Sequence, residues 1–284
     1  FCSFIFRSMI NFNGDILDQE KFSLTAENRG FKYGDAVFET IKVVNNKVIF
    51  WEDHYFRLMA SMRMLRMKIP MSFTLEFLEK EILSLVKANN TLQKSRVRLT
   101  IFRKDGGLYT PKTNEIDFLV EASELNQNIK NDYKIDIFKD FYNYSGLLST
   151  IKTNNKMLNT LASVFAKEND LDNCILINEK KGVVEVTNGN IFIVKDNVVK
   201  TPSTTEGCIK GIVRKKVLEI ISKNEEFKVE ETSISPFEIQ KADEVFITNA
   251  IIGIQPVTQY KKKTFKVDFS KKIAKNLQVL EFTT

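Results

Sequence analysis

Four short apolar runs follow one another closely in the C-terminal half of the chain and constrain its fold more than any other feature. The runs CILIN, VVEV, NIFIV and NVVK are separated by turn residues such as Lys181-Gly182 and Asp196-Asn197. Short apolar runs rich in β-branched residues and bounded by turns are typical of strands. We therefore predict that this half is rich in β-sheet.

The N-terminal half combines strands with helices. Asn45-Asn46 forms a good two-residue hairpin turn between the runs IKVV and KVIF. Asp53 is expected to cap a helix that ends near Met67, and a second helix opens after Ser72 with one apolar stripe. The remaining predicted elements are strands around 95–103, 115–122 and 244–248, and helices at about 153–170, 211–223 and 270–279.

A polar segment, ELNQNIKND at 124–132, is the best candidate for an interdomain linker. The chain of 284 residues exceeds the usual size of one domain. We therefore predict an α+β fold with an N-terminal domain at 9–123 and a C-terminal domain at 133–284.

Composition excludes several classes of protein. The three cysteines, Cys2, Cys174 and Cys208, form no CxxC pair, and with a single histidine no metal site or disulfide framework is expected. The apolar stretch Phe1–Ser8 is shorter than a signal-peptide core, and no segment approaches the roughly 18 apolar residues of a membrane span. A soluble, cytoplasmic protein with no membrane association is the expectation.

The net charge of +6 and the sequence pI of about 9.0 raise the alternative of a non-catalytic protein that binds nucleic acid. The basic residues are scattered, however, and tight runs such as Lys261–Lys263 are short. A solvated basic surface without nucleic-acid binding is therefore predicted.

Two polar residues stand in apolar surroundings. In STIKTNN, Lys152 follows a strand-like residue at the start of a helix, where a buried amine would have a lowered pKa and attack carbonyl groups. In GVVEVTNGNIF, Glu185 lies within a strongly apolar strand pair and would need a partner there. A solvated lysine and a glutamate that faces water from a strand edge are the alternatives.

Two further segments could bind an anion through backbone amides. In EGCIKGIVRKKV, two glycines lead into a helix whose first-turn amides would be free to hold a phosphate. In FITNAIIGIQPV, the small residues Thr248-Asn249-Ala250 end a strand and could form a second anion nest. An ordinary helix start and a simple turn are the alternatives.

In this order, the four segments resemble those of the fold-type IV pyridoxal-phosphate enzymes, the class IV aminotransferase family. This family includes branched-chain aminotransferases, D-amino-acid aminotransferases and aminodeoxychorismate lyases. The resemblance runs from about Met9 to Val257. RGFKYGDAVFETIKV and HYFRLMASMRML add to it, because they resemble the family's RG-x-x-x-GD-x-x-FE and H-x-x-RL-x-x-S signatures. The fold that it implies is a small α/β N-terminal domain and a larger β-barrel-like C-terminal domain with helices, in a homodimer.

The resemblance also implies a cofactor, pyridoxal 5′-phosphate. Lys152 would hold it as a Schiff base, and Glu185 would face its ring nitrogen. Arg57 and the amides of Ile212 and Val213 would hold the phosphate, although the family usually has threonine where Val213 stands. Further cofactor contacts are expected from Asn190, Thr248 and Asn249.

A second lysine competes for the attachment. Lys156 begins KMLNTL, which resembles the family's K-x-x-N pattern as KTNN at Lys152 does. The spacing from Lys152 to Glu185 allows alignment with the D-amino-acid enzymes without a gap, whereas Lys156 would need a deletion. We therefore predict Lys152 as the catalytic lysine.

Two activities stay open within the family. An aminotransferase acting on branched-chain or D-amino acids and a 2-oxo acid is favoured, because Arg98 matches an arginine that binds substrate carboxylate in branched-chain enzymes; Met157, however, replaces their tyrosine. The alternative is 4-amino-4-deoxychorismate lyase, which makes 4-aminobenzoate and pyruvate. Thr40 would be its catalytic threonine, whereas Leu108 replaces an arginine often found there. The predicted substrate pocket consists of Tyr33, Phe38, Arg98, Tyr109 and Ala250.

Overall fold

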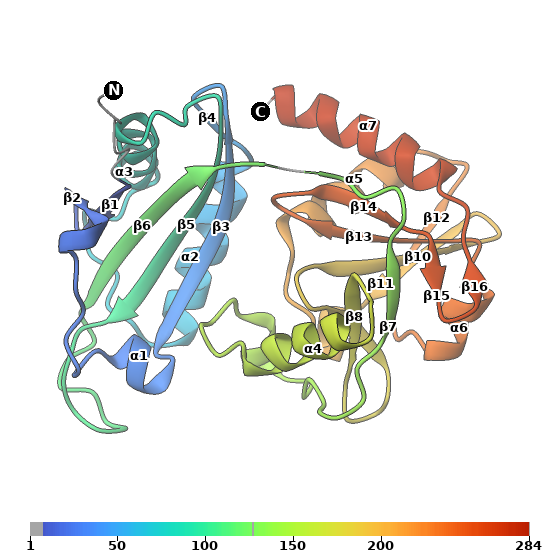
Figure 1. Ribbon diagram of the computed structural model, residues 1–284, viewed down its shortest axis with the longest axis horizontal. Coiled ribbons are helices and arrows are strands. Elements are labelled where there is room, and N and C mark those ends of the chain that lie inside the picture. Colours follow the sequence, from blue (N-terminus) through green and yellow to red (C-terminus); the bar gives the residue numbers. More distant parts are fainter. Residues whose placement is uncertain (1–7, 127, 284) are drawn as a thin grey trace, which may run out of the picture. The chain divides into compact units, whose positions relative to one another are not determined.

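The computed structural model describes residues 8–126 and 128–283, so Cys2 and all but the last residue of the stretch Phe1–Ser8 lie outside the described residues. By its contacts the chain divides into two compact units (Figure 1). The N-terminal unit comprises the chain up to Asn126 together with Lys152–Asn155, and the C-terminal unit comprises the rest. One short segment of the predicted second domain therefore packs with the first unit. The predicted α+β class is confirmed.

The N-terminal unit is built on one six-stranded sheet with the order β2-β1-β6-β5-β3-β4. Its strands are β1 (Met9–Phe12), β2 (Asp15–Asp18), β3 (Ala36–Val44), β4 (Lys47–Val48), β5 (Lys94–Arg103) and β6 (Ile116–Glu124). Its α-helices are α1 (Arg29–Tyr33), α2 (Trp51–Met64) and α3 (Leu75–Ala88). Helix α2 contacts β3 and helix α3 contacts β6, and the apolar stripe of α3 is buried at Leu78, Ile82 and Leu85.

Local turn chemistry predicted the β3–β4 hairpin correctly but not the start of α2. Asn45 and Asn46 both have positive φ, as a type I′ turn requires. Helix α2 begins two residues before Asp53, after Phe50 in the left-handed region, so the prediction that Asp53 caps this helix is wrong. Both Phe50 and Trp51 are buried, and their packing moves the helix start upstream.

The first half of β3 has an open edge that a distant segment occupies. Strand β4 pairs only with the last two residues of β3. Farther along the edge, the Phe38 N–H donates to the carbonyl of Lys152 at 2.9 Å, and the Asn154 N–H donates to the carbonyl of Ala36 at 3.0 Å. An antiparallel bridge joins Val37 to the intervening Thr153. This pairing attaches 152–155 to the N-terminal unit.

The C-terminal unit contains two five-stranded sheets with the orders β12-β11-β10-β13-β14 and β16-β15-β7-β8-β9. The strands of the first are β10 (Asn190–Lys195), β11 (Val198–Pro202), β12 (Lys228–Thr232), β13 (Glu244–Asn249) and β14 (Gly253–Val257). Those of the second are β7 (Lys134–Ile137), β8 (Asn173–Ile177), β9 (Val183–Val186), β15 (Gln259–Tyr260) and β16 (Lys263–Thr264).

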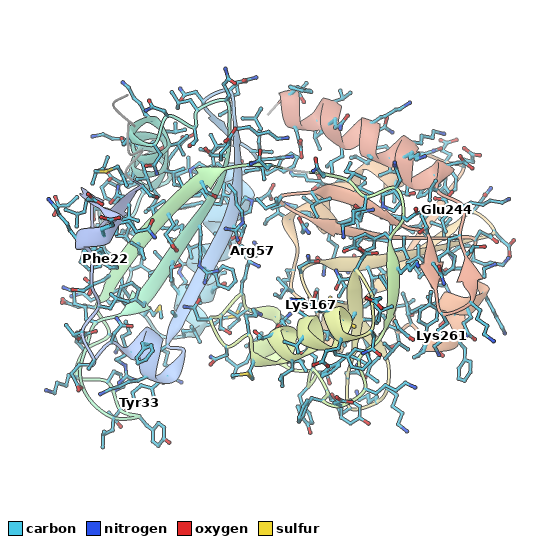
Figure 2. The ribbon with its side chains drawn as sticks, in the orientation of Figure 1. Phe22, Tyr33, Arg57, Lys167, Glu244 and Lys261 are labelled. Carbon is cyan, nitrogen blue, oxygen red and sulfur yellow. The ribbon has the colours of Figure 1, made fainter. Side chains whose placement is uncertain are left out.

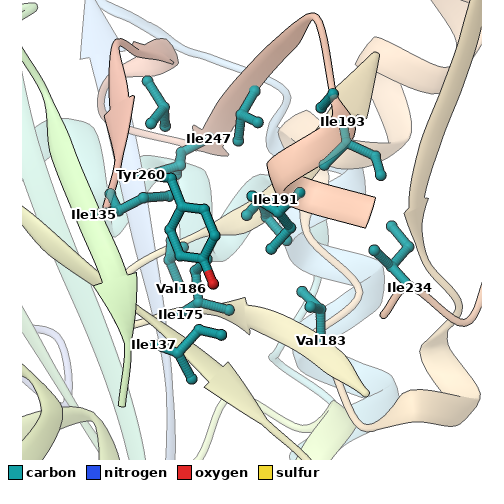
Figure 3. Packing of buried hydrophobic residues seen from close by; sticks show 14 of the residues in the cluster. Ile135, Ile137, Ile175, Val183, Val186, Ile191, Ile193, Ile234, Ile247 and Tyr260 are labelled. Atoms are coloured by element: carbon teal, nitrogen blue, oxygen red, sulfur yellow. The ribbon is translucent and has the colours of Figure 1, made fainter. Parts of the chain in front are cut away.

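Both sheets contribute to one apolar core, in which Ile135 and Ile175 of one sheet gather with Ile191 and Ile247 of the other (Figure 3). The helices of this unit are α4 (Met157–Glu168), α5 (Ile212–Ser222), α6 (Pro236–Lys241) and α7 (Asp268–Thr283). Helix α4 packs on β8, and α5 and α7 contact β13. Within the described part of the chain, no helix has the length and apolar character needed to cross a membrane.

Candidate active site

A buried acid on β3 orients an arginine of α2. Glu39 Oε1 accepts a hydrogen bond from Arg57 Nε at 2.8 Å, and Oε2 accepts a second from Arg57 Nη2. His54 Nδ1 lies 2.7 Å from the same Oε2. Burial opposes ionisation of Glu39, but Arg57 and His54 outweigh it and hold the pKa of the carboxyl at about 2. Burial also lowers the pKa of His54, so the ion pair is that of Glu39 with Arg57.

The Arg57 side chain is only 14% exposed, so it is not an ordinary solvated arginine on a helix surface. Figure 2 shows Arg57 on α2 in the N-terminal unit. Two hydrogen bonds to one carboxylate fix the plane of a guanidinium group. Arg57 therefore has the orientation that an anion-binding arginine needs.

Two predicted site residues, Arg98 and Lys152, lie over the ring of a third, Phe38 on β3. The Arg98 guanidinium carbon lies 3.7 Å from the centroid of the Phe38 ring, and Lys152 Nζ lies 4.4 Å from the same centroid. Arg98 Nε donates to Thr100 Oγ1 at 3.1 Å, and Arg98 Nη2 donates to Asn154 Oδ1 at 3.0 Å. The structure thus brings the predicted carboxylate-binding arginine and the predicted catalytic lysine together.

Thr40 and Arg98 are directly opposite each other on β3 and β5, which places their side chains on the same face of the sheet. Glu121 of β6 lies on the other side of Arg98, with its Oε2 3.9 Å from Arg98 Nε. This face therefore combines a hydroxyl, a cation paired with a carboxylate, and the Phe38 ring.

Tyr33 and Tyr109 form a second aromatic group, with ring centroids 5.7 Å apart. Arg29 holds the loop that carries Tyr109, because its Nη1 donates to the carbonyl of Leu108 at 2.6 Å. Its Nε pairs with Asp35 at 2.9 Å. The RG-x-x-x-GD signature therefore has a structural role in positioning a loop whose tyrosine is 89% exposed.

Glu185 of the C-terminal unit is buried, with only 5% of its surface exposed, which rules out a glutamate that faces water. Its Oε2 accepts the Ile209 N–H at 3.0 Å. Lys156 precedes α4 in this unit, and burial lowers its pKa while the charge of Glu185 raises it. The two candidate lysines thus belong to different units, Lys152 to the edge of β3 and Lys156 to the start of α4.

The start of α5 has the geometry of a phosphate site. No side chain caps this helix at Gly211, so the first-turn amides of Ile212 and Val213 have no partner within the helix. Asn190 Nδ2 donates to the carbonyl of Ile209 at 2.9 Å. A Cβ atom on Gly211 would lie 2.0 Å from Asn190 Oδ1, so only glycine allows this close approach.

Thr248 lies opposite Asn190 across β10 and β13. Its Oγ1 is buried and has no hydrogen-bond partner among the described residues. An unpaired buried hydroxyl costs about 1–3 kcal/mol, so a bound acceptor would relieve a real penalty here. Asn249 Oδ1 accepts the N–H groups of Ile251 and Ile252 at 3.0 and 2.9 Å, so this side chain shapes the turn that contains Ala250.

Several residues of the site were not singled out from sequence. Glu39 and His54 stand within the signature stretches, but their contact needs α2 to pack on β3. Asn154 and Thr100 orient Arg98, and only the pairing of 152–155 with β3 brings Asn154 to it. No group of three or more His, Cys, Asp or Glu side chains within 8–126 and 128–283 could hold a metal ion.

The chain resembles known proteins over nearly its whole length. A family model described as amino-transferase class IV matches residues 36–260. A putative branched-chain-amino-acid aminotransferase of Methanocaldococcus jannaschii is 30% identical over 96% of this chain and 92% of that protein. A D-alanine aminotransferase of Bacillus licheniformis is 28% identical over 94% and 93%. The structure of a branched-chain aminotransferase from Thermoproteus uzoniensis with norvaline superposes with a TM-score of 0.89, at 24% identity over 96% and 95%.

Proposed function

The chain belongs to the class IV aminotransferase family, and we propose that it moves an amino group between an amino acid of branched-chain or D-amino-acid type and a 2-oxo acid. The cofactor of this family is pyridoxal 5′-phosphate. The observation that carries the proposal is the grouping of Arg98 and Lys152 around Phe38, because it combines a carboxylate receptor with an amine.

The residues present fit this cofactor. In the C-terminal unit, the unpaired Thr248 hydroxyl and the free amides of Ile212 and Val213 are donors suited to a phosphate, and in the N-terminal unit Arg57 is an oriented cation suited to the same group. Asn190 and Asn249 keep the adjoining turns in shape through the hydrogen bonds of their side chains. The family usually has threonine at the position of Val213. Because Val213 has no hydroxyl, it can donate to the phosphate only through its backbone amide.

When bound, pyridoxal phosphate supplies an electron sink for negative charge at the substrate α-carbon. Glu185 would keep a proton on the pyridine nitrogen, since a buried carboxylate stabilises a neighbouring N–H cation strongly. The Ile209 N–H holds the Glu185 carboxylate in place.

We propose that Lys152 carries the proton that is transferred during the reaction. Its amine would take the proton from the substrate α-carbon and deliver it to the cofactor carbon that receives the amino group. The pairing of 152–155 with β3 fixes its backbone, and the Phe38 ring holds its ammonium group. Lys156 is the rival, supported by its lowered pKa and by its electrostatic contact with Glu185.

Arg98 would bind the substrate carboxylate. Its guanidinium is fixed by Thr100, Asn154 and the Phe38 face, so little side-chain freedom is left to lose on binding. The walls of the substrate pocket would be Tyr33, Phe38, Tyr109 and Ala250.

A lyase is the second candidate. Thr40 lies opposite Arg98 on the same face of the sheet, where a hydroxyl could take part in pyruvate release from 4-amino-4-deoxychorismate. The test is incubation of the holoenzyme with branched-chain L-amino acids, D-alanine and aminodeoxychorismate in turn. A change of the visible absorption spectrum on addition of an amino acid supports transamination. Formation of pyruvate and 4-aminobenzoate from aminodeoxychorismate, with no spectral change on addition of an amino acid, supports the lyase.

We also propose a cytoplasmic homodimer. The loop held by Arg29 carries Leu108 and Tyr109, which are 77% and 89% exposed. A second copy of the chain could bury these apolar side chains. Cys174 and Cys208 are both free thiols, consistent with a reducing compartment. Light scattering at micromolar concentration tests the dimer, and a monomeric mass would contradict it.

A further inference from the structure

Three lysines from separate turns of the C-terminal unit line one cavity of about 370 Å³. Lys139 follows β7, Lys181 lies in the β8–β9 turn and Lys261 lies in the β15–β16 turn, where Figure 2 labels it. None of the three ammonium groups forms an ion pair with any of the described residues. Lys261 begins a run of three lysines, Lys261–Lys263.

The inner wall of this lysine-rimmed cavity is apolar and aromatic. Ile137 and Ile177, both members of the apolar core, line it. Phe237 of α6 also lines the cavity and is 74% exposed, although it is a large apolar side chain. Tyr260 is 1% exposed, and Lys261 Nζ lies 5.2 Å from its ring centroid. An ammonium group is thus held beside an aromatic wall.

No acidic side chain is among the described residues that line the cavity. Burial raises the pKa of Tyr260 to about 12, with a further contribution from Asp136, so the Tyr260 hydroxyl is neutral at physiological pH. Asp136 is the acid that acts on Tyr260, and it does not line the cavity. Like charges beside an apolar wall repel more strongly than in bulk water. An anion at the mouth would therefore lower the electrostatic energy.

We propose that this cavity binds a small carboxylate with an aliphatic or aromatic body, as a site separate from the residues assigned to catalysis. The lysines would bind the carboxylate, and the apolar wall with Phe237 would contact the aliphatic or aromatic part of the ligand. A volume of about 370 Å³ lies within the range of roughly 300–1,000 Å³ that is usual for small-molecule sites. Gln240, a polar neutral side chain of the lining, offers both a donor and an acceptor.

The test is calorimetric titration of the full-length holoenzyme with 3-phenylpropanoate, with the neutral 3-phenylpropanamide as its matched probe. The variant carrying Lys139→Gln, Lys181→Gln and Lys261→Gln should bind the carboxylate at least about fivefold more weakly, because three exposed charge contacts add modestly. The carboxylate should also bind more weakly as salt rises.

A control variant with Lys223→Gln, Lys271→Gln and Lys275→Gln removes the same charge from exposed positions of the C-terminal unit outside the cavity lining. It should keep the affinity of the unmodified protein. Equal weakening in both variants, or equal binding of the amide and the carboxylate, would overturn the proposal.

Photoaffinity labelling distinguishes binding at this cavity from binding at Arg98. A 3-phenylpropanoate probe carrying a photoreactive diazirine should label peptides that contain 236–241 or 259–262. Labelling confined to the peptides of Arg98 and Lys152 would contradict a separate site. This outcome does not depend on whether the chain is an aminotransferase.

Discussion

Asn154 Oδ1 accepts a hydrogen bond from Arg98 Nη2 at 3.0 Å, and so links the segment of Lys152 to the arginine assigned to the substrate carboxylate. The two residues lie far apart in the sequence and meet because 152–154 pairs with the edge of β3. The position of Arg98 therefore depends on the segment that carries Lys152, the proposed catalytic amine.

Asn154→Ala should raise the KM for the amino acid by about 3- to 10-fold, the size expected for the loss of one orienting hydrogen bond. The kcat should change less, because Lys152 keeps its backbone pairing with Phe38. Steady-state kinetics with the preferred amino acid measure both constants.

Asn155→Ala is the matched control, since Asn155 is exposed and its side chain donates a hydrogen bond to the carbonyl of Gly34, at 3.3 Å, rather than accepting one from Arg98. It should leave KM nearly unchanged. Equal KM changes in the two variants would mean that the Arg98–Asn154 contact does not position the substrate.

Thr248→Val should have opposite effects on the apoprotein and on the cofactor complex. The hydroxyl has no partner among the described residues, so its removal should stabilise the apoprotein by about 1 kcal/mol. Affinity for pyridoxal phosphate should fall about tenfold, because the proposed contact of the Thr248 hydroxyl with the phosphate would be lost. Denaturant unfolding of the apoprotein and equilibrium dialysis measure the two effects.

The buried Thr201 provides the comparison, because its Oγ1 donates to the carbonyl of Ile191 at 2.8 Å. Thr201→Val should destabilise the apoprotein, since it leaves a carbonyl unpaired. If Thr248→Val destabilised the apoprotein as much as Thr201→Val does, the Thr248 hydroxyl would already have a hydrogen-bond partner in the apoprotein, and its role as a phosphate donor would be contradicted.

Glu39→Gln should destabilise the protein and change its response to acid. The pKa of Glu39 falls from 4.5 to about 2 on folding, so its ionised form adds stability that is complete above pH 4.5 and is lost as the pH falls toward 2. The shift corresponds to about 3 kcal/mol at neutral pH.

Urea unfolding at a series of pH values measures this contribution. Between pH 5 and 2, the stability of the variant should fall less steeply than that of the unmodified protein. Parallel curves would show that Glu39 titrates normally and that Arg57 owes its orientation to other groups.

Some elements were predictable because their cause is local. Asn45-Asn46 accepts positive φ at both turn positions, and the stripe at Leu78 and Ile82 has the spacing of a helix face. The start of α2 was not predictable in this way, because burial of Trp51 decides it. Strand β14 and helix α6 also carried no distinct periodicity, since both are short.

The candidate site was predictable only where a residue lies in a motif. Lys152, Glu185 and Arg57 could be named from the resemblance, but their partners could not. Glu39 meets Arg57 across a helix–sheet contact, and Asn154 meets Arg98 across a strand edge. Such contacts depend on tertiary packing, and the order of residues does not reveal them.

The central claim is that Lys152, and not Lys156, carries the cofactor. Borohydride reduction of the yellow holoenzyme followed by peptide mapping tests it most directly, with Lys156→Met as the companion variant. We expect the modified lysine to be Lys152, and we expect Lys156→Met to remain yellow and reducible. Modification of Lys156, with loss of the yellow colour in Lys156→Met, would contradict the assignment.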